Sequence, residues 1–179
     1  MIEDKWLIWQ YKHGSSDALG RIYDKYVQKM HTTAMLLVGD SATAEDIVHD
    51  VFVKLARSVR SIRIEGSLKA YLTKCVVNRA RDLIRGKKPL QTLTKDELLV
   101  SDAQGPVQLA EKVETRKMIA DALNQLPDEQ KEVIVMHLSA GLKHRQIAET
   151  LDLSINTVQS RYRYGLEKMR SVFNGELEL

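Results

Sequence analysis

Side chains that can read DNA bases lie on one face of the segment 154–173, near the end of the chain. The outward positions of this face are Asn156, Gln159, Ser160, Arg161, Arg163 and Tyr164. Asn and Gln side chains pair bidentately with adenine, and Arg pairs bidentately with guanine. The segment holds four basic residues and one acid, whereas an ordinary surface helix mixes the two charges. We therefore predict that this face contacts DNA, with Arg161, Lys168 and Arg170 placed for phosphates.

The elements that position this face form a helix-turn-helix. The apolar residues Ile147, Ala148 and Leu151 predict a short helix over 144–151, and the sequence DLS then turns the chain. Ser154 is the expected N-cap of the second helix. The buried side of that helix is expected to carry Ile155, Val158, Tyr162, Leu166 and Met169. In this motif the second helix enters the major groove and its first turns contact base edges.

Two other segments carry charge of one sign. Six basic residues and one acid lie between Lys74 and Lys88, whereas residues 39–52 hold four acids and no Lys or Arg. Asp82 is spaced to pair with Arg79 and Arg85, which would stabilise a helix. Acidic side chains in the first turn of a helix interact favourably with the helix dipole. This effect does not explain the presence of Asp50. The opposite charges of the two segments indicate two kinds of partner.

Hydrophobic periodicity predicts an all-α protein of two small helical domains joined by an extended linker. Helices are expected over 3–12, 67–85, 109–125 and 128–139. A further helix is expected to start at a cap formed by Ser15–Asp17 and to end at Gly39. Another is expected to start at Thr43 as N-cap, with Asp46 as its capping-box partner. Pro127 is expected in the first turn of the helix over 128–139. We predict a first domain over 1–86, a linker over 87–108 and a second domain over 109–179.

Composition limits the class of protein. The chain has 179 residues, of which 44% are hydrophobic, so it can bury a core, and its net charge is only +3. Its single cysteine, Cys75, cannot form an internal disulfide, which fits a reducing compartment. The first ten residues lack the basic start of a signal peptide, and no apolar stretch is long enough to span a membrane. These features predict a cytoplasmic protein with no membrane insertion.

Three strings, in order, resemble one family: the extracytoplasmic-function (ECF, group 4) sigma factors of bacterial RNA polymerase, in the sigma-70 family. AEDIVHDVFVKLA is similar to the helix that binds core polymerase, and YLTKCVVNRARDLIR is similar to the helix that binds the promoter −10 element. LPDEQKEVIVMHLSAGLKHRQIAETLDLSINTVQSRYRYGLEKMR is similar to the −35 domain. The resemblance covers residues 14–172.

The resemblance implies a role for each segment. Glu45, Asp46, His49, Asp50 and Lys54 would bind core RNA polymerase, on the clamp helices of its β′ subunit, with the β subunit as a further partner. The residues expected at the −10 element are Arg63, Gly66, Ser67, Lys74, Asn78, Arg79 and Arg85. The loop 62–67 would capture a flipped base. The residues expected at the −35 element are His144, Arg145, Asn156, Thr157, Gln159, Ser160, Arg161, Arg163 and Tyr164. Linker 87–108 would follow the RNA path, and an anti-sigma factor is a further expected partner.

The chain departs from the family pattern at a few positions. His49 stands where Gln is usual, Asp50 stands where Glu is frequent, and Tyr71 stands where Trp is frequent. The sequence Lys143-His144-Arg145-Gln146-Ile147-Ala148 replaces the usual Ser-Tyr-x-Glu-Ile-Ala. The first helix of the −35 motif is therefore more basic than usual, which favours contact with the DNA backbone.

Two other functions fit part of the sequence. A conventional helix-turn-helix regulator would use residues 107–172, but would leave the acidic segment and the first basic helix without a role. A helical-bundle enzyme could share a metal between His49 and Glu45 or Asp46, but needs a second carboxylate–histidine set that the sequence lacks. Phosphate-loop and nucleophile-elbow motifs are also missing. We therefore expect no enzymatic activity, no catalytic residue, no metal and no cofactor.

Overall fold

The computed structural model describes residues 2–58, 64, 67–86, 115 and 117–175, in which every regular element is a helix. The labelled helices are α1 (Ile2–Lys12), α2 (Ser16–Val38), α3 (Ser41–Ser58), α4 (Leu68–Gly86), α6 (Asp128–Leu138), α7 (His144–Leu151) and α8 (Ile155–Phe173). Residues 117–124 are also helical. The predicted all-α class is confirmed. The linker 87–108 lies outside the described residues, and the predicted domain limits remain a prediction.

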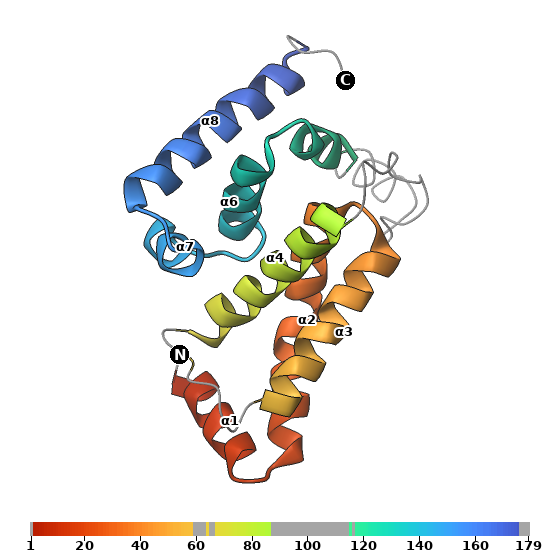
Figure 1. The fold of residues 1–179 in the computed structure, drawn as a ribbon, viewed down its shortest axis with the longest axis vertical. Coiled ribbons are helices and arrows are strands. Elements are labelled where there is room, and N and C mark those ends of the chain that lie inside the picture. The colour runs from red at the N-terminus through yellow and green to blue at the C-terminus, as the bar shows by residue number, and fades with distance from the viewer. Residues whose placement is uncertain (1, 59–63, 65–66, 87–114, 116, 176–179) are drawn as a thin grey trace.

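Helices α1 to α4 form an N-terminal bundle in which α2 contacts each of the other three helices (Figure 1). Ile22 and Met30 of α2, Ile47 of α3 and Leu72 of α4 are fully buried in its core. Each such side chain contributes about 1.5–3 kcal/mol through burial. This packing fixes the directions in which α3 and α4 present their polar faces.

The ends of α2 and α3 follow local capping rules. Ser15 accepts a hydrogen bond from the Ala18 backbone N–H, and Gly39 ends α2 in a left-handed conformation with φ of 77°. The predicted Thr43 cap of α3 is wrong. Asp40 accepts from the Thr43 N–H at 2.8 Å, and α3 begins at Ser41. Both residues are good caps, and Asp40 comes first, directly after the glycine that ends α2.

Helices α6, α7 and α8 form a C-terminal bundle. Asp152 has φ of 56° and turns the chain between α7 and α8, which confirms the predicted helix-turn-helix. Pro127 stands one position outside α6 and caps it, rather than lying in its first turn. Gly165 of α8 packs closely on α6, because a Cβ there would lie 2.5 Å from the Cδ1 of Ile134. Ile155, predicted to be buried, is the first residue of α8 and is exposed.

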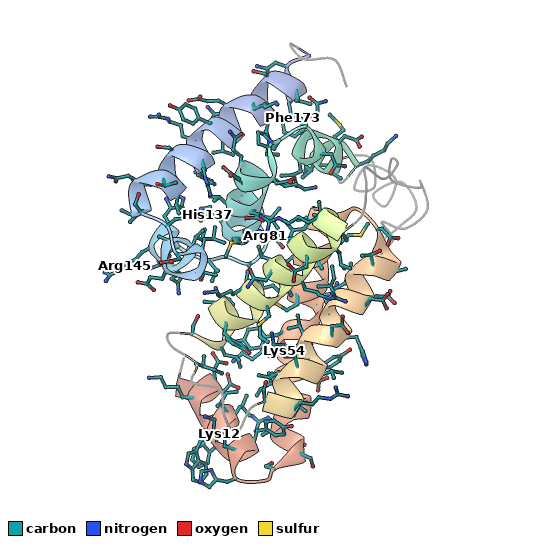
Figure 2. The ribbon with its side chains drawn as sticks, in the orientation of Figure 1. Lys12, Lys54, Arg81, His137, Arg145 and Phe173 are labelled. Atoms are coloured by element: carbon teal, nitrogen blue, oxygen red, sulfur yellow. The ribbon has the colours of Figure 1, made fainter. Side chains whose placement is uncertain are left out.

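The two bundles contact each other through α2 and α6 and through α4 and α7. Arg81 of α4 donates to both carboxylate oxygens of Glu132 in α6, with Nε at 2.8 Å and Nη2 at 2.6 Å (Figure 2). Lys69 of α4 donates to the Gly141 carbonyl at 2.8 Å. The hydroxyls of Thr33 and Ser139 also meet, at 3.1 Å. These polar contacts join the bundles in this structure.

Candidate nucleic-acid interface

Helix α8 presents the predicted DNA-contacting face to solvent. Ser154 caps the helix by accepting from the Thr157 N–H at 3.0 Å, and Val158 and Met169 bury the opposite side. Asn156, Gln159, Arg163 and Tyr164 are exposed, whereas Thr157 and Ser160 are half-buried. The guanidinium of Arg163 lies over the Tyr164 ring, 4.8 Å from its centroid. The exposed residues offer amide and guanidinium groups suited to base edges.

Arg161 differs from its neighbours on α8, because it turns back toward α6. Its Nη2 donates to Glu129 at 2.8 Å, and its side chain is 24% exposed. A guanidinium already paired with a carboxylate is less available to a phosphate. The structure therefore separates Arg161 from the exposed set that the sequence grouped with it.

Two of the residues expected at the −35 element lie on α7, one exposed to solvent and one packed against other helices. Arg145 is exposed and lies 3.3 Å from Glu149, one turn further along the helix. His144 instead packs against the rings of His137 and Tyr162, with each centroid 4.8 Å away. Partial burial and the neighbouring His137 lower the pKa of His144, which disfavours its charged form. His144 is thus positioned to join α6, α7 and α8 rather than to carry charge to DNA.

Helix α4 presents a basic surface beside the acidic surface of α3. Lys74, Asn78 and Arg85 are exposed. Arg79 donates to Asp50 of α3 at 2.9 Å, so the expected pairing of Arg79 with Asp82 is replaced by a link between helices. Ser67 caps α4 by accepting from the Ala70 N–H at 3.1 Å. Arg63 and Gly66 lie outside the described residues.

The acidic segment forms a solvent-facing strip on α3. Glu45, Asp46, His49, Asp50 and Lys54 are all exposed, and Figure 2 labels Lys54 on this helix. The buried residues Ile47, Val48 and Val51 face the other way, toward α2 and α4. Because Glu45 and Asp46 point away from the core, they have no packing role and are available to a basic partner surface, whereas Asp50 is paired with Arg79 of α4.

A cleft between the bundles was not foreseen from the sequence. It has a volume of about 340 Å³, and charged residues from both bundles line it: Arg81, Arg85, Asp128, Glu129, Lys131, Glu132 and Arg161. Lys131 is buried, and its ammonium donates to the Leu37 carbonyl at 3.0 Å and to Asn124 Oδ1 at 2.8 Å. Burial lowers the pKa of Lys131 to about 8. On the sequence alone, Lys131 and Glu132 look like ordinary charged positions of a surface helix.

The described residues include no group of three His, Cys, Asp or Glu side chains that could hold a metal ion. Within the same part of the chain, none of the helices combines the length and apolar character needed to cross a membrane.

Known proteins match this chain over nearly its whole length. The profile of sigma-70 region 2 matches residues 22–89, and that of sigma-70 region 4 matches residues 116–169. The ECF RNA polymerase sigma factor SigW of Bacillus subtilis is 28% identical over 173 residues, covering 91% of this chain and 92% of its own. The ECF RNA polymerase sigma-E factor of Haemophilus influenzae is 24% identical and covers 89% of each chain.

Solved structures share the fold. CnrH in complex with the cytosolic domain of CnrY superposes with a TM-score of 0.76 at 20% identity, covering 98% of this chain and 99% of that one. The sigma factor RpoE of Bartonella quintana, in complex with the anti-sigma factor NepR, has a TM-score of 0.64 at 18% identity and covers 86% and 97%. Because the two profiles follow each other and together match more than half of the chain, it belongs to the sigma-70 family, in its extracytoplasmic-function group.

Proposed function

We propose that this chain binds core RNA polymerase and directs promoter-specific initiation of transcription, as an ECF sigma factor. The single observation that carries the proposal is the order of the two profile matches, region 2 followed by region 4, along one chain. The nucleotidyl transfer itself is assigned to the polymerase, and this chain supplies promoter recognition in the cytoplasm, where the polymerase acts.

The −35 element is assigned to the helix-turn-helix of α7 and α8. The exposed Asn156, Gln159 and Arg163 support base contacts in the major groove, because their side chains face solvent on one side of α8. Arg145 supports a phosphate contact from α7, because its side chain is 83% exposed. Under this proposal residues 109–179 form the −35 domain.

The −10 element is assigned to α4 and the loop before it, within a domain over residues 1–86. Lys74, Asn78 and Arg85 are exposed on α4 and supply positive charge and an amide. The residues 87–108 would connect the two domains. In this division, a separate group of helices binds each promoter element.

The exposed strip on α3 is assigned to core polymerase. Its acids, Glu45, Asp46 and Asp50, carry negative charge toward solvent, which complements a basic docking surface. Charge complementarity of this kind mainly speeds association and selects the partner. Lys54 is the basic residue at one end of this acidic strip.

An anti-sigma factor is the further partner that we infer. Both related structures contain a second protein: CnrH is bound to the cytosolic domain of CnrY, and RpoE is bound to the anti-sigma factor NepR. The charged cleft between the bundles gives such a partner simultaneous access to α4, α6 and α8. Binding there would hold the bundles together.

Run-off transcription with purified core polymerase tests the proposed function. Transcripts that appear only when this chain is added, from a subset of a promoter-fragment library, are the expected result. No transcripts, together with tight binding of duplex DNA by the chain alone, would instead favour a conventional helix-turn-helix regulator. The library sequences would also define both promoter elements.

A further inference from the structure

We propose that a column of three aromatic rings, two on α1 and one directly after it, stacks unpaired bases of the opened promoter strand. The column consists of Trp6, Trp9 and His13 and is called the aromatic column below. The inference rests on the proposed function, because it takes the opened strand as the ligand. It adds a binding surface on α1, which none of the predicted DNA-contacting residues occupies.

Trp6 and Trp9 stack on each other and face solvent, and His13 adds a third ring tilted by 30° from Trp9. The centroids of Trp6 and Trp9 lie 4.9 Å apart with an angle of 11° between the rings. His13 continues the column at 4.2 Å from Trp9, and its Nδ1 is held 2.8 Å from the Trp9 carbonyl. Trp6 and Trp9 are 53% and 50% exposed. Large rings at this exposure add little to the core, so the fold does not explain them.

A groove runs beside the aromatic column. With 3.6 residues per turn, Lys5, Ile8 and Lys12 share one side of α1, adjacent to the side that carries the three rings. The groove has a volume of about 180 Å³, and its walls are formed by Asp4, Lys5, Ile8, Lys12, Ile64, Ser67 and Leu68. Ser67 and Leu68 begin α4, the helix assigned to the −10 element. The groove beside the column therefore reaches the start of the helix where strand opening is proposed.

Charge around the groove favours a polyanion. The two acids of α1 are already paired: Lys25 of α2 lies 2.5 Å from Glu3 and 2.8 Å from Asp4. Hydrogen bonds to Asp4 and Glu3 raise the pKa of Lys25, so its ammonium stays charged beside both acids. Lys25 offsets one of these two negative charges, and with Lys5 and Lys12 the three lysines and two acids sum to +1 along this part of α1. Aromatic faces beside lysines are the combination that binds single strands without sequence preference.

Bases fit this surface better than a protein partner does. Trp6 and Trp9 already lie face to face, with His13 tilted by 30° against Trp9, so a base can stack on an exposed ring of the column. A protein partner would require an apolar pocket for its own side chains, whereas the neighbouring groove is lined by two lysines and an aspartate. The backbone of a strand laid on the rings would bring its phosphates beside these lysines.

Intrinsic fluorescence can test the column directly, because Trp6 and Trp9 are the two tryptophans of the chain. The full-length chain is titrated with single-stranded oligothymidylate and with an abasic strand of equal length and charge. We expect the oligothymidylate to quench the emission and the abasic strand to leave it nearly unchanged. Equal responses to both strands would overturn the proposal, because stacking requires a base.

Transcription by the holoenzyme provides the second test. The variant W6A/W9A should lower open-complex formation on a duplex promoter by about tenfold, while W6F/W9F should restore most of it. F173A is the matched control, since Phe173 is an exposed aromatic at the opposite end of the molecule from Lys12 (Figure 2). F173A should initiate as the wild type does.

The outcomes separate the inference from the proposed function. Failure of the wild-type chain to support initiation refutes both. Initiation by W6A/W9A at the wild-type rate refutes the aromatic column alone. Weaker binding of W6A/W9A to core polymerase, measured without DNA, would also refute it, because the column would then be a protein contact.

Discussion

Glu132 of α6 receives two hydrogen bonds from Arg81 of α4, and this pair connects the helix assigned to the −10 element with the bundle assigned to the −35 element. The carboxylate raises the pKa of Arg81. The side chains of Arg81 and Glu132 are 33% and 11% exposed, so the pair is largely shielded from water. The two bundles are therefore held in register by a charge pair with defined geometry.

The first prediction concerns this pair. Glu132→Gln removes the charge but keeps the size of the side chain. We therefore expect the equilibrium constant between joined and separated bundles to fall by about tenfold, the equivalent of about 1.4 kcal/mol. Because the bundles would separate more often, the radius of gyration from small-angle X-ray scattering should increase.

The matched control is Glu149→Gln, which removes the partner of Arg145 on the exposed side of α7. Exposed pairs contribute little to stability, so its scattering should equal that of the wild type. An unchanged radius for Glu132→Gln as well would show that apolar contacts hold the bundles together.

The second prediction concerns pH and Lys131. Burial lowers the folded-state pKa from its ordinary value of 10.5 to about 8, so between these values the unfolded chain binds the extra proton. The free energy of unfolding should therefore rise as pH increases from 8 to 10.5, by up to about 3 kcal/mol. Lys131→Met should lack this rise.

Chemical denaturation of the wild type and Lys131→Met at pH 7.5, 9 and 10.5 measures the effect. The difference between the two proteins isolates Lys131, because Tyr26 and Tyr71, whose pKa values burial raises to about 12, are common to both. Parallel pH profiles would contradict the prediction.

The third prediction concerns the acidic strip on α3. Asp46→Lys combined with Asp50→Lys should lower the affinity for core polymerase at least tenfold, about 1.4 kcal/mol, because the docking charges are reversed. Loss of the exposed Asp50–Arg79 pair should change the free energy of unfolding by less than about 1 kcal/mol.

Asp24→Lys combined with Glu149→Lys makes the same charge change elsewhere and should bind core normally. A folding defect in the first variant would identify the strip as structural.

The fourth prediction concerns base preference. Gln159→Ala and Arg163→Ala should each weaken discrimination at the −35 element by about 1–3 kcal/mol and leave the affinity for core unaltered. Selection from randomised −35 sequences would measure the loss. Glu167→Ala, at another exposed position of α8, should keep the wild-type preference. A uniform loss across all sequences would assign the two residues to phosphates instead.

The fifth prediction concerns the close contact of α8 with α6. Gly165→Ala should lower the free energy of unfolding by about 1 kcal/mol, because the added Cβ overlaps Ile134 by more than alanine's helix preference offsets. In an Ile134→Val background the overlapping Cδ1 is absent, so the same substitution should be neutral or stabilising. An equal cost in both backgrounds would show that Ile134 is not the obstacle.

Helix positions could be predicted from the sequence, because apolar periodicity and caps act locally. Gly39 and Ser154 end and begin helices where the pattern placed them, whereas Asp40 accepts the first-turn N–H of α3 in place of the predicted Thr43 cap. Ile155 follows the periodicity of a buried face yet is exposed at the start of α8. Periodicity indicates a direction on a helix and does not show how far the neighbouring helix extends.

Contacts between distant segments could not be predicted. The carbonyl that accepts from Lys131 belongs to a residue 94 positions earlier, and Glu132 meets an arginine 51 positions earlier. A buried lysine and a surface lysine look alike in a single sequence. The same limit hid the cluster of His137, His144 and Tyr162, whose members come from three helices.

The contact of Lys131 with the last turn of α2 also affects how easily the bundles part. The Leu37 carbonyl lies at the negative end of the α2 dipole, and the ammonium meets it there in place of solvent. When the bundles separate, both groups regain hydration, as do Arg81 and Glu132. Rehydration of these groups lowers the free-energy cost of separating the bundles below that of separating an apolar interface. The contact between the bundles can therefore open and close reversibly.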